Sequence, residues 1–442
     1  MNLENIEGKK VLVVGGGGRE HAIADALHRS LHVGRLFCAP GNAGMSQIAE
    51  CLPIKDNDID ALLAFAKEEH IDLTVVGPEV PLCAGITDRF TAEGLRVFGP
   101  SQKAAQVESS KDFAKKIMSD HHIPTAAYRT FSDYEEALAY VKAGSFPVVL
   151  KYDGLAAGKG VVIPTTLEEA DETLKDMLLD DKFGHGSVVI EEFLTGPEFS
   201  YLCMVCGKEV FPLAVSQDHK RAYEGDEGPN TGGMGAYSPV SLISKADEEY
   251  ALEQIMKPMA AAMVKEGCAF KGLLYGGLMK TPDGIKVIEF NCRFGDPETE
   301  VILPRLKTDI YEMFSAIVDG FASEDTSVEG MHTTAGELMP EIRWADEQTL
   351  GFVLASKGYP GSYEKGFEIK GLEEVAAMEG ITLYHMGTRL ENGVFKTNGG
   401  RVLMVVASAP TVQESKEKAL EAISKISCDH LFYRKDIGWR VM

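Results

Sequence analysis

Basic residues are scarce in this chain of 442 residues. Lys and Arg number 44 against 67 Asp and Glu, which gives a formal net charge of −23. Broad nucleic-acid binding needs a basic face, so this class of function is disfavoured. A small anionic substrate remains compatible with the charge, because local lysines, arginines, metal ions and helix termini can reverse the field around a site.

Long apolar runs are also missing. No segment approaches the length of a membrane span, and the first ten residues, MNLENIEGKK, lack the apolar stretch of a signal peptide. The eight cysteines are scattered, as is typical of a reduced protein. We therefore expect a cytoplasmic protein that does not act at a membrane.

Zinc-site and redox motifs are lacking too. Cys203 and Cys206 have CxxC spacing, but they lie in a predicted strand, where positions three apart face opposite sides. No second Cys or His pair with zinc-site spacing accompanies them. We interpret both as core cysteines.

The chain is too long for one compact core, so roughly two to four domains are expected. Strands alternate with helices over the first 120 residues, which predicts an open parallel α/β sheet. From about residue 125 the pattern changes to strands around a glycine loop (148–164), and a helix is expected at 248–267. The last 110 residues carry short strands and a helix, as in a separate small α/β domain.

The run VIEFNCRFGDPETE (287–300) points to a metal site. It begins as a strand, in which Glu289 and Asn291 project to one face while Ile288 and Phe290 point to the other. Neighbouring carboxylate and amide oxygens suit a hard cation such as Mg²⁺, which also keeps water and phosphate ligands. A solvated strand end in an acidic protein is the alternative.

The segment GGGGREH (15–21) joins an apolar strand to an amphipathic helix, where backbone N–H groups and the helix N-terminus can hold a phosphate. A dinucleotide fingerprint is not matched, because Glu20 or His21 replaces the third glycine and the next strand does not end in an acidic residue. We therefore favour a phosphate-bearing substrate over NAD. The alternative is a tight turn that needs glycine only for packing.

A second glycine-rich loop, DGLAAGKG (153–160), lies between two predicted strands and does not match a Walker motif. With Lys151 before it and Lys159 within it, the hairpin is similar to a lid over nucleotide phosphates. A surface hairpin is the alternative.

Two further segments are polar. EEFLTGPE (191–198) follows an apolar strand and could read a nucleotide. The polar, glycine-rich stretch 218–239 is predicted to be a functional loop that begins with Asp218, His219 and Lys220. For His219, a structural role is as plausible as acid–base chemistry.

Together, the motifs resemble the phosphoribosylamine–glycine ligase family of the ATP-grasp superfamily. GGGGREH, PGNAG, GPEVPL, KYDGLAAGKG, IEEFLTGPEFS, SQDHKR, GPNTGGMGAYSP and RFGDPETE occur in the family's order over nearly the whole chain. RFGDPE and NTGGMGAYSP are specific to this family. The resemblance implies an α/β multidomain fold with an N-terminal open parallel α/β (pre-ATP-grasp) domain (1–123), an ATP-grasp lid subdomain (124–194), an ATP-grasp core subdomain (195–330) and a small C-terminal α/β domain (331–442).

The resemblance also implies a set of binding residues. Lys111 and Lys151 would contact ATP phosphates, Glu191 and the backbone near Leu194 the adenine, and Glu198 the ribose; the full implied ATP set is Lys111, Lys151, Gly158, Lys159, Gly160, Glu191, Glu192, Leu194 and Glu198. Glu289 and Asn291 would hold Mg²⁺, with Mn²⁺ as an alternative. LLYGGLMK (273–280) lacks the acidic residue that many superfamily members carry there, which leaves the number of metal ions open.

The implied substrates are glycine and phosphoribosylamine. The residues implied for phosphoribosylamine are Gly16, Gly17, Gly18, Arg19, Glu20, Gly41, Asn42, Gly77, Pro78 and Glu79. Arg293 and the segment Asp218–Lys220 are the candidates for glycine, Asp296 completes the substrate set, and Arg293, Lys151 and Asp218 are the candidates for catalysis.

The implied reaction is ATP-dependent ligation through a glycyl phosphate, in purine biosynthesis, by a monomer or weak homo-oligomer. Three rivals remain: an ATP-grasp carboxylase or formyltransferase, a Rossmann-type dehydrogenase, and a nucleotide sensor without catalysis.

Overall fold

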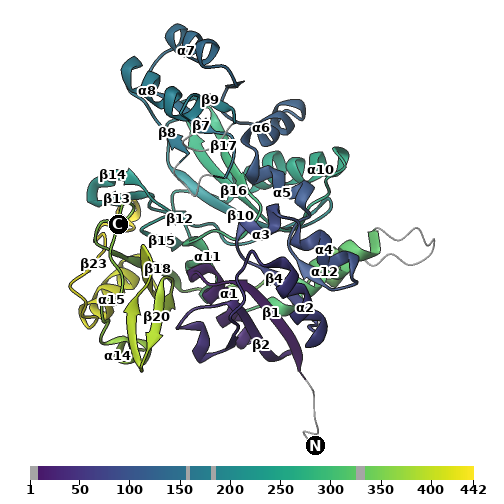
Figure 1. Cartoon of the computed structure of the whole chain (residues 1–442), viewed down its shortest axis with the longest axis vertical. Helices are drawn as coiled ribbons and strands as arrows, with labels where there is room; N and C mark the ends of the chain where they lie inside the picture. The colour runs from purple at the N-terminus through teal and green to yellow at the C-terminus, as the bar shows by residue number, and fades with distance from the viewer. Residues whose placement is uncertain (1–7, 156–159, 181–185, 325–333) are drawn as a thin grey trace, which may run out of the picture.

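The structure is a computed structural model that describes residues 8–155, 160–180, 186–324 and 334–442. An N-terminal region, a small region at the top and a C-terminal region surround the centre of the molecule (Figure 1). Among the described residues, no helix combines the length and the apolar character needed to cross a membrane.

The N-terminal region is built on the predicted parallel sheet. Its strands run in the order β3-β2-β1-β4-β5: β1 (Lys9–Gly15), β2 (Val33–Pro40), β3 (Glu50–Cys51), β4 (Leu73–Val76) and β5 (Val97–Phe98). The helices of this region are α1 (Gly18–His28), α2 (Ile59–Glu68), α3 (Glu79–Cys83), α4 (Ile86–Ala92) and α5 (Gln102–Ser109). Residues 11–14 of β1 are fully buried, as expected for a central parallel strand covered on both faces.

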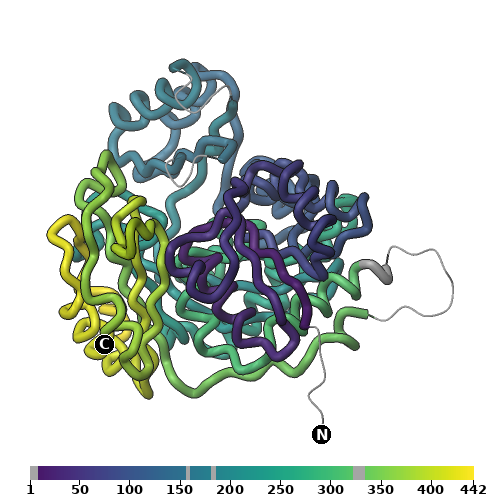
Figure 2. Tube along the Cα trace, turned by 60° about the horizontal axis from the view of Figure 1, so that its bottom comes forward, coloured from purple at the N-terminus to yellow at the C-terminus, as the bar shows by residue number. Residues whose placement is uncertain are grey.

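The small region at the top, which we call the lid, forms a separate lobe of the chain trace (Figure 2). It has its own hydrophobic core. Its antiparallel sheet has the order β6-β9-β7-β8: β6 (Tyr128–Phe131), β7 (Val148–Tyr152), β8 (Val161–Val162) and β9 (Val188–Glu192). Helices α7 (Tyr134–Ala143) and α8 (Leu167–Leu178) pack on this sheet through apolar residues such as Leu138 and Leu174. A separate core lets the lid keep its shape as a unit.

A second antiparallel sheet lies below the lid, in the order β11-β10-β16-β17. It consists of β10 (Glu198–Cys206), β11 (Glu209–Pro212), β16 (Lys271–Thr281) and β17 (Gly284–Asn291), and α6 (Lys111–Asp120) and α12 (Ile310–Glu324) lie beside it. Cys203 and Cys206 on β10 are both buried, but they belong to different hydrophobic clusters on the two faces. The prediction of core cysteines is confirmed.

The helix expected at 248–267 is interrupted. The structure has α9 (Lys245–Ala251), a π-helical turn (Leu252–Met256) and α10 (Lys257–Lys265). Pro258 lies at the start of α10, where its missing N–H and its ring are incompatible with the preceding helical hydrogen bonds. The π turn accommodates this local break.

The C-terminal region contains a sheet with the order β12-β15-β18-β22-β19, and β23 (Leu431–Phe432) pairs with β18. The later strands of this sheet are β18 (Gln348–Ser356), β19 (Ile381–His385) and β22 (Arg401–Ala409). The region also contains a hairpin of β20 (Thr388–Glu391) and β21 (Val394–Thr397). Its helices are α13 (Ala335–Leu338), α14 (Leu372–Ala376) and α15 (Val412–Ser424). Two strands from before residue 330 belong to the same sheet: β12 (Gln217–Asp218) and β15 (Gly235–Ser238). The sheet therefore spans the predicted boundary at residue 330, and the domain boundaries stay a prediction.

The stretch 218–239, predicted as a long loop, is mostly strand. Between β12 and β15 it forms a hairpin of β13 (Arg221–Tyr223) and β14 (Glu227–Asn230). The loop prediction was wrong because these strands are polar and rich in glycine, and their pairing depends on residues elsewhere in the chain. Arg434 is almost fully buried and holds the hairpin, by an ion pair to Asp226 of 3.0 Å and a hydrogen bond of 2.9 Å to the carbonyl of Arg221.

Candidate active site

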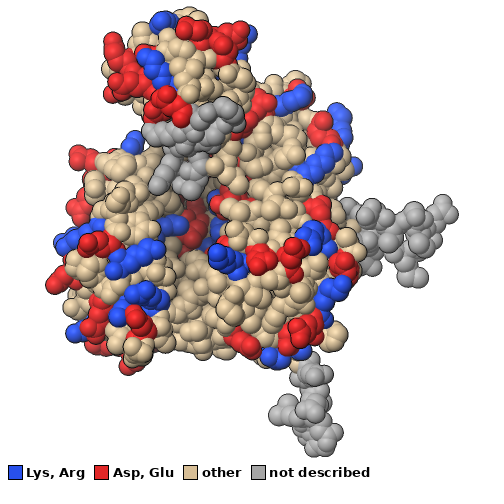
Figure 3. Space-filling model, in the orientation of Figure 1, with Lys and Arg blue, Asp and Glu red and all other residues tan. Residues whose placement is uncertain are grey.

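A cavity of about 770 Å³ lies where the lid, the N-terminal sheet, β17 and the C-terminal sheet meet. Figure 3 shows this hollow at the centre of the face, with acidic and basic side chains inside it. Its lining draws on every region: Arg19 and Glu79 from the first, Lys151 from the lid, Glu289 from β17 and Arg401 from the last. Segments distant in sequence thus form one chamber that contains charged groups from every region.

Three glycine-containing turns meet at one edge of the N-terminal sheet. In the parallel register, Val14 of β1 pairs with Ala39 of β2 and with Val76 of β4, so the carboxyl ends of the three strands coincide. The turns at Gly15–Gly18, Gly41–Asn42 and Gly77–Glu79 follow directly. This is the position where the strand order reverses, which is where open α/β sheets bind ligands.

Close backbone approach requires glycine at two of these turns. A Cβ on Gly16 would lie 2.5 Å from the carbonyl oxygen of Gly41, and Gly41 itself has φ of +70°. A third, Gly77, leaves room for the Glu20 side chain: a Cβ there would lie 2.1 Å from Oε1 of Glu20. The glycines are therefore needed for packing, and this does not exclude a role in substrate binding.

Carboxyl groups gather at the N-terminus of α1. Glu20 turns back and its Oε2 accepts a hydrogen bond of 2.7 Å from the N–H of Gly17, while its Oε1 pairs with Nε of Arg19 at 2.5 Å. Glu300 of α11 (Glu298–Ile302) is fully buried beside Gly18, and burial raises its pKa well above the ordinary value. A phosphate bound near this helix end would therefore lie close to the carboxyl groups of Glu20 and Glu300.

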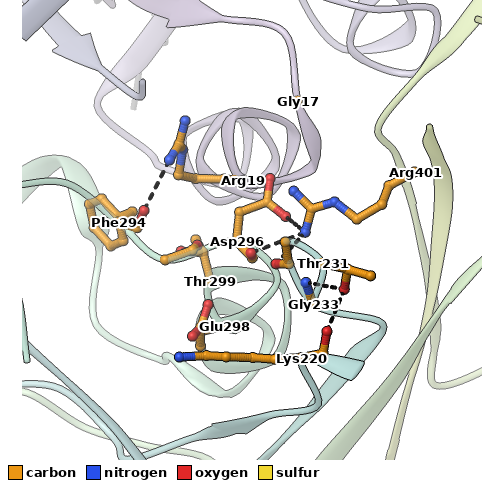
Figure 4. A network of polar contacts seen from close by, with 12 residues as sticks. Gly17, Arg19, Lys220, Thr231, Gly233, Phe294, Asp296, Glu298, Thr299 and Arg401 are labelled. Atoms are coloured by element: carbon orange, nitrogen blue, oxygen red, sulfur yellow. Dashed lines mark hydrogen bonds and ion pairs between the residues drawn. The ribbon is translucent and has the colours of Figure 1, made fainter. Parts of the chain in front are cut away.

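Asp296 links this helix end to the C-terminal sheet. Its carboxylate pairs with Nη1 of Arg401 at 2.9 Å, and the same nitrogen donates to the carbonyl of Gly232 at 2.8 Å (Figure 4). Arg401 is a residue that the sequence prediction missed. It stands at the start of an apolar strand, and no local motif marks it.

Asn42 contributes to the fold more than to the cavity. Its side-chain N–H₂ donates to the carbonyls of Gly16 (3.0 Å) and His385 (2.7 Å), and its oxygen accepts from the N–H groups of Gly44 and Met45. All of its hydrogen-bonding groups are therefore engaged, and it does not line the cavity. Its predicted contact with substrate stays a prediction.

A buried triad joins the lid to α6. Glu191, at the end of β9, pairs with Nζ of Lys151 at 2.9 Å and with Nζ of Lys115 at 3.0 Å, and all three side chains are buried. Burial lowers the pKa of Lys115 to about 8, against the opposing charge of Glu191. Lys115 was missed because a lysine on an amphipathic helix is ordinarily solvated. Glu191 is predicted to recognise adenine. Its carboxylate is paired with both Lys151 and Lys115, and its charge orients these two lysines.

Lys111 begins α6, and a lid residue holds this helix end. Asp153, at the start of the second glycine-rich loop, accepts hydrogen bonds from the N–H groups of Lys111 (2.6 Å) and Asp112 (3.2 Å). Nζ of Lys111 donates to the carbonyl of Gly154 at 3.0 Å, and burial lowers its pKa. Lys111 and Lys151 both line the cavity. The predicted phosphate contacts Gly158 and Lys159 lie outside the described residues.

Glu289 and Asn291 on β17 both line the cavity, but the strand is not regular. Gly277 pairs with Glu289 and Leu278 with Val287, so Ile288 is an extra, bulged residue. The bulge brings Ile288 to the cavity beside Glu289, where its carbonyl accepts a hydrogen bond of 2.8 Å from Nζ of Lys151. The regular alternation assumed for residues 287–291 therefore does not hold at Ile288, and the direction of its side chain stays a prediction.

The donor set at β17 fits a hard cation. Burial opposes ionisation of Glu289, but the charges of Lys220, Lys151 and Lys111 outweigh it and lower its pKa, so a carboxylate and an amide oxygen are offered together. Among the described residues, no three His, Cys, Asp or Glu are arranged as a metal cluster. A cation held here would take its remaining ligands from water and phosphate, as Mg²⁺ commonly does in proteins.

Arg293 is held between two carboxylates. Its Nη2 pairs with Glu108 at 2.9 Å and its Nε with Glu79 at 3.4 Å. Burial opposes its charge, but Glu108 and Glu79 outweigh this and raise its pKa. Glu108 was another residue the sequence did not reveal.

The segment 218–220 lies at the cavity. Asp218 and Lys220 line it beside Glu198 and Glu289. His219 also belongs to the lining, but its ring is buried and its Nε2 accepts a hydrogen bond of 3.2 Å from the N–H of Gly438, which supports a structural role. Burial raises the pKa of Asp218 to about 7, and Glu298 and Glu198 add to this against Lys220.

Most of the predicted site residues meet in this one cavity. The predicted residues that line it are Arg19, Glu79, Lys111, Lys151, Gly160, Glu191, Glu192, Leu194, Glu198, Asp218, Lys220, Glu289, Asn291, Arg293 and Asp296. Those that lie behind its surface are Gly16, Gly17, Gly18, Glu20, Gly41, Asn42, Gly77 and Pro78. The binding role of each stays a prediction.

Comparison with known proteins identifies the family to which this arrangement of domains belongs. Models of the N domain, ATP-grasp (A) domain and C domain of phosphoribosylglycinamide synthetase match residues 9–108, 109–299 and 349–440. The phosphoribosylamine–glycine ligase of Halalkalibacterium halodurans is 52% identical over 430 residues, which cover 97% of this chain and 96% of that protein. The chain belongs to the phosphoribosylglycinamide synthetase family.

Solved structures agree with the family assignment. The crystal structure of phosphoribosylamine–glycine ligase from Thermotoga maritima has a TM-score of 0.78 at 32% identity, and covers 97% of this chain and 100% of its own. A biotin carboxylase complex from Campylobacter jejuni, at 14% identity and a TM-score of 0.72 (97% of this chain, 93% of its own), shares the fold alone. The predicted fold class is confirmed, and the ATP-grasp domain of the synthetase family implies ATP binding.

Proposed function

We propose that the protein is an ATP-dependent ligase that joins glycine to phosphoribosylamine and yields glycinamide ribonucleotide, ADP and phosphate, a step of purine biosynthesis. The observation that carries this proposal is one cavity in which Lys111 and Lys151, the β17 oxygens, and Arg19 and Glu79 beside the glycine turns of the N-terminal sheet converge. Family membership supports it, because relatives that cover nearly the whole chain are named for this ligation.

ATP would lie between the lid and β17. Lys111 and Lys151 face the cavity from α6 and β7 and suit the triphosphate, while Glu198 suits the ribose and the backbone near Leu194 the adenine. Glu289 and Asn291 would hold Mg²⁺, or Mn²⁺ in its place. When bound, such an ion neutralises phosphate charge and helps to align the transferred group.

The chemistry must turn a carboxylate into an acylating agent. A carboxylate oxygen of glycine attacks the γ-phosphorus of ATP, the bond to the β-phosphate oxygen breaks, and ADP leaves. The resulting glycyl phosphate has a good leaving group. Arg293, fixed by Glu79 and Glu108, is our candidate to hold the glycine carboxylate for this attack.

The amine of phosphoribosylamine then attacks the acyl carbon. Phosphate leaves, an amide bond forms, and the nitrogen loses a proton. Asp218 is our candidate to accept that proton, because a carboxyl group with a pKa of about 7 is matched to proton transfer near neutral pH. A closed lid would keep water from the acyl phosphate.

The deciding experiment is a coupled assay of ADP release with glycine and freshly generated phosphoribosylamine. We expect full turnover only with both substrates, and formation of glycinamide ribonucleotide in step with ADP. Release of ADP with bicarbonate or formate in place of glycine would instead indicate the related carboxylase or formyltransferase chemistry. ATP binding without substrate-dependent ADP release would contradict the proposal and favour a nucleotide sensor.

A further inference from the structure

The hairpin of β13 and β14 has almost no apolar core of its own. Of residues 221–230, all of which the structure describes, only Ala222 is buried, and the one aromatic side chain, Tyr223, is exposed. A two-stranded hairpin with so little apolar burial is at best marginally stable in water. Its position therefore depends on contacts with other parts of the chain.

The end of the chain makes these contacts. Figure 1 shows the hairpin beside the C-terminus. In the described part of the chain, the hydrogen bonds and ion pairs that leave residues 221–230 end on Arg434, Lys435, Asp436 and Arg440. We call residues 434–440 the C-terminal strap.

Asp226, at the turn of the hairpin, is the central contact. One oxygen of its carboxylate pairs with Arg434 at 3.0 Å, and the other oxygen pairs with Arg440. Arg434 also pairs with Asp436 at 2.8 Å, and Asp436 accepts a hydrogen bond of 2.9 Å from the N–H of Gly225. Two arginines and two aspartates thus form a charge-balanced cluster that joins the hairpin to the strap.

The strap is itself anchored in the C-terminal sheet. Ile437 is fully buried, and a Cβ on Gly235 of β15 would lie 2.9 Å from its Cγ1, so the glycine leaves room for this side chain. The N–H of Gly438 donates its hydrogen bond to His219, directly after β12. The strap therefore connects the hairpin to two strands of the sheet.

The hairpin borders the cavity. Asn230 and Arg440 both line it. The hydroxyl of Thr231 donates a hydrogen bond of 2.8 Å to the carbonyl of Lys220 (Figure 4), and Nη1 of Arg401 donates to the carbonyl of the next residue at 2.8 Å. A shift of the hairpin would therefore move the backbone of Lys220 and a partner of Arg401.

We propose that the C-terminal strap is a positioning element for glycine and phosphoribosylamine. By holding the hairpin, it fixes the cavity wall beside Lys220 and Asp296, which are our candidates for binding these substrates. The phosphate candidates for ATP, Lys111 and Lys151, lie on α6 and in the lid and make no hydrogen bond to the hairpin. Loss of the strap contacts therefore weakens the binding of the two small substrates more than that of ATP.

The test uses two substitutions that loosen the strap without removing its buried arginine. Asn tolerates the left-handed φ of +57° that Asp226 adopts, so D226N removes the charge and keeps the turn. R440Q removes the partner on the strap. R389Q is the control, because Arg389 also pairs with a carboxylate, Glu391 at 3.3 Å, but on the hairpin of β20 and β21.

Two readouts are compared with the parent chain. Hydrogen exchange of residues 221–230, and cleavage at Glu224 and Glu227 by a glutamate-specific protease, should be about tenfold faster in D226N and R440Q, because a charge-assisted contact is lost. KM for glycine and for phosphoribosylamine should rise about tenfold, and KM for ATP less. R389Q should match the parent chain in every measurement.

The double variant D226N/R440Q separates positioning from direct binding. If Arg440 acts through Asp226, the double variant is no worse than D226N, because both substitutions remove the same pair. A further rise in KM would mean that Arg440 binds a substrate itself, and would overturn the proposal.

Unchanged exchange in D226N and R440Q, or an equal rise in KM for ATP, would also overturn it. The inference rests on the proposed function for the identity of the substrates. If the protein lacks ligase activity, exchange and proteolysis still decide whether the strap holds the hairpin, so the two failures are distinguishable.

Discussion

Individual charged residues determine the electrostatics of the cavity, although the chain as a whole is strongly acidic. Three cationic groups there are matched with carboxylates: Lys151 and Lys115 with Glu191, and Arg293 with Glu108 and Glu79. Removing one partner of such a buried pair leaves an uncompensated charge, so the paired residues hold each other in place. ATP and glycine bring further negative charge, which the lysines and Arg293 can meet.

Glu289 gives the first prediction at this scale. We expect E289Q to lower kcat/KM about a hundredfold or more, because the amide keeps one oxygen but loses the negative charge that attracts the cation, and about 3 kcal/mol corresponds to a factor of about a hundred. The measurement is steady-state ADP release over a range of Mg²⁺ concentrations, with Tm as a test of folding. E253Q, at an exposed helix glutamate paired with Lys257, should be unchanged. Undiminished turnover by E289Q would show that the metal assignment is wrong.

Asp218 gives a pH prediction. Its raised pKa of about 7 means that the carboxylate dominates only above that pH. If Asp218 accepts the amine proton, the rate of amide formation rises with pH up to about 7 and then levels. D218N should remove this dependence and lower kcat about a hundred- to a thousandfold. A pH–rate profile of both proteins checks this; an unchanged acidic limb in D218N would rule out the assignment.

At the scale of elements, short irregular features orient the functional groups. The bulge at Ile288 turns a backbone carbonyl of β17 toward Lys151, and Asp153 of the lid loop caps α6 at Lys111. The lid is also tied to β17 through Glu192, which pairs with Lys286 at 3.1 Å. The position of the lid and the positions of Lys111 and Lys151 are thus coupled.

The cap on α6 can be tested against a second cap in the same region. D153A should lower stability by about 1 kcal/mol through the lost helix cap, and should raise KM for ATP more than KM for glycine, because Lys111 loses its support. D133A removes the N-cap of α7, which lies within the lid. It should cost similar stability and leave both KM values unchanged. Equal effects of the two variants on KM for ATP would contradict a specific role for Asp153.

At the scale of the whole molecule, the N-terminal and C-terminal regions are joined by buried contacts. The N–H of His385 on β19 donates a hydrogen bond of 2.8 Å to Nδ1 of His21 on α1, and Asn42 binds the carbonyl of the same residue. An exposed ion pair of 2.8 Å between Arg96 and Asp319 also joins the N-terminal region to α12, beside the central sheet. The lid, by contrast, has a hydrophobic core of its own.

Buried histidines predict acid sensitivity. Burial lowers the pKa of His219 to about 3 from an ordinary 6.5, so the unfolded chain takes up a proton first as the pH falls. The contribution of the neutral, buried His219 to stability is complete well above pH 6.5 and is lost progressively as the pH falls through 6.5 toward about 3. At about pH 5 the loss from one such histidine is about 2 kcal/mol. H219Q should remove this part of the decline between about pH 7.5 and 5 in thermal or urea unfolding. H28Q, at an exposed histidine, should not, and an identical decline in H219Q would contradict the prediction.

The sequence by itself determined the features that depend on neighbours along the chain. Apolar runs and glycine turns specified the parallel sheet and the edge at which its glycine turns meet, and strand alternation put Glu289 and Asn291 on one face. Only the tertiary structure decided the rest: Lys115 and Lys151 on one carboxylate, Arg401 against Asp296, the bulge at Ile288, and the union of β12 and β15 with the last strands. Periodicity acts over a few residues, because backbone geometry sets it. Contacts between residues hundreds of positions apart depend on how whole elements pack, and no local pattern records that.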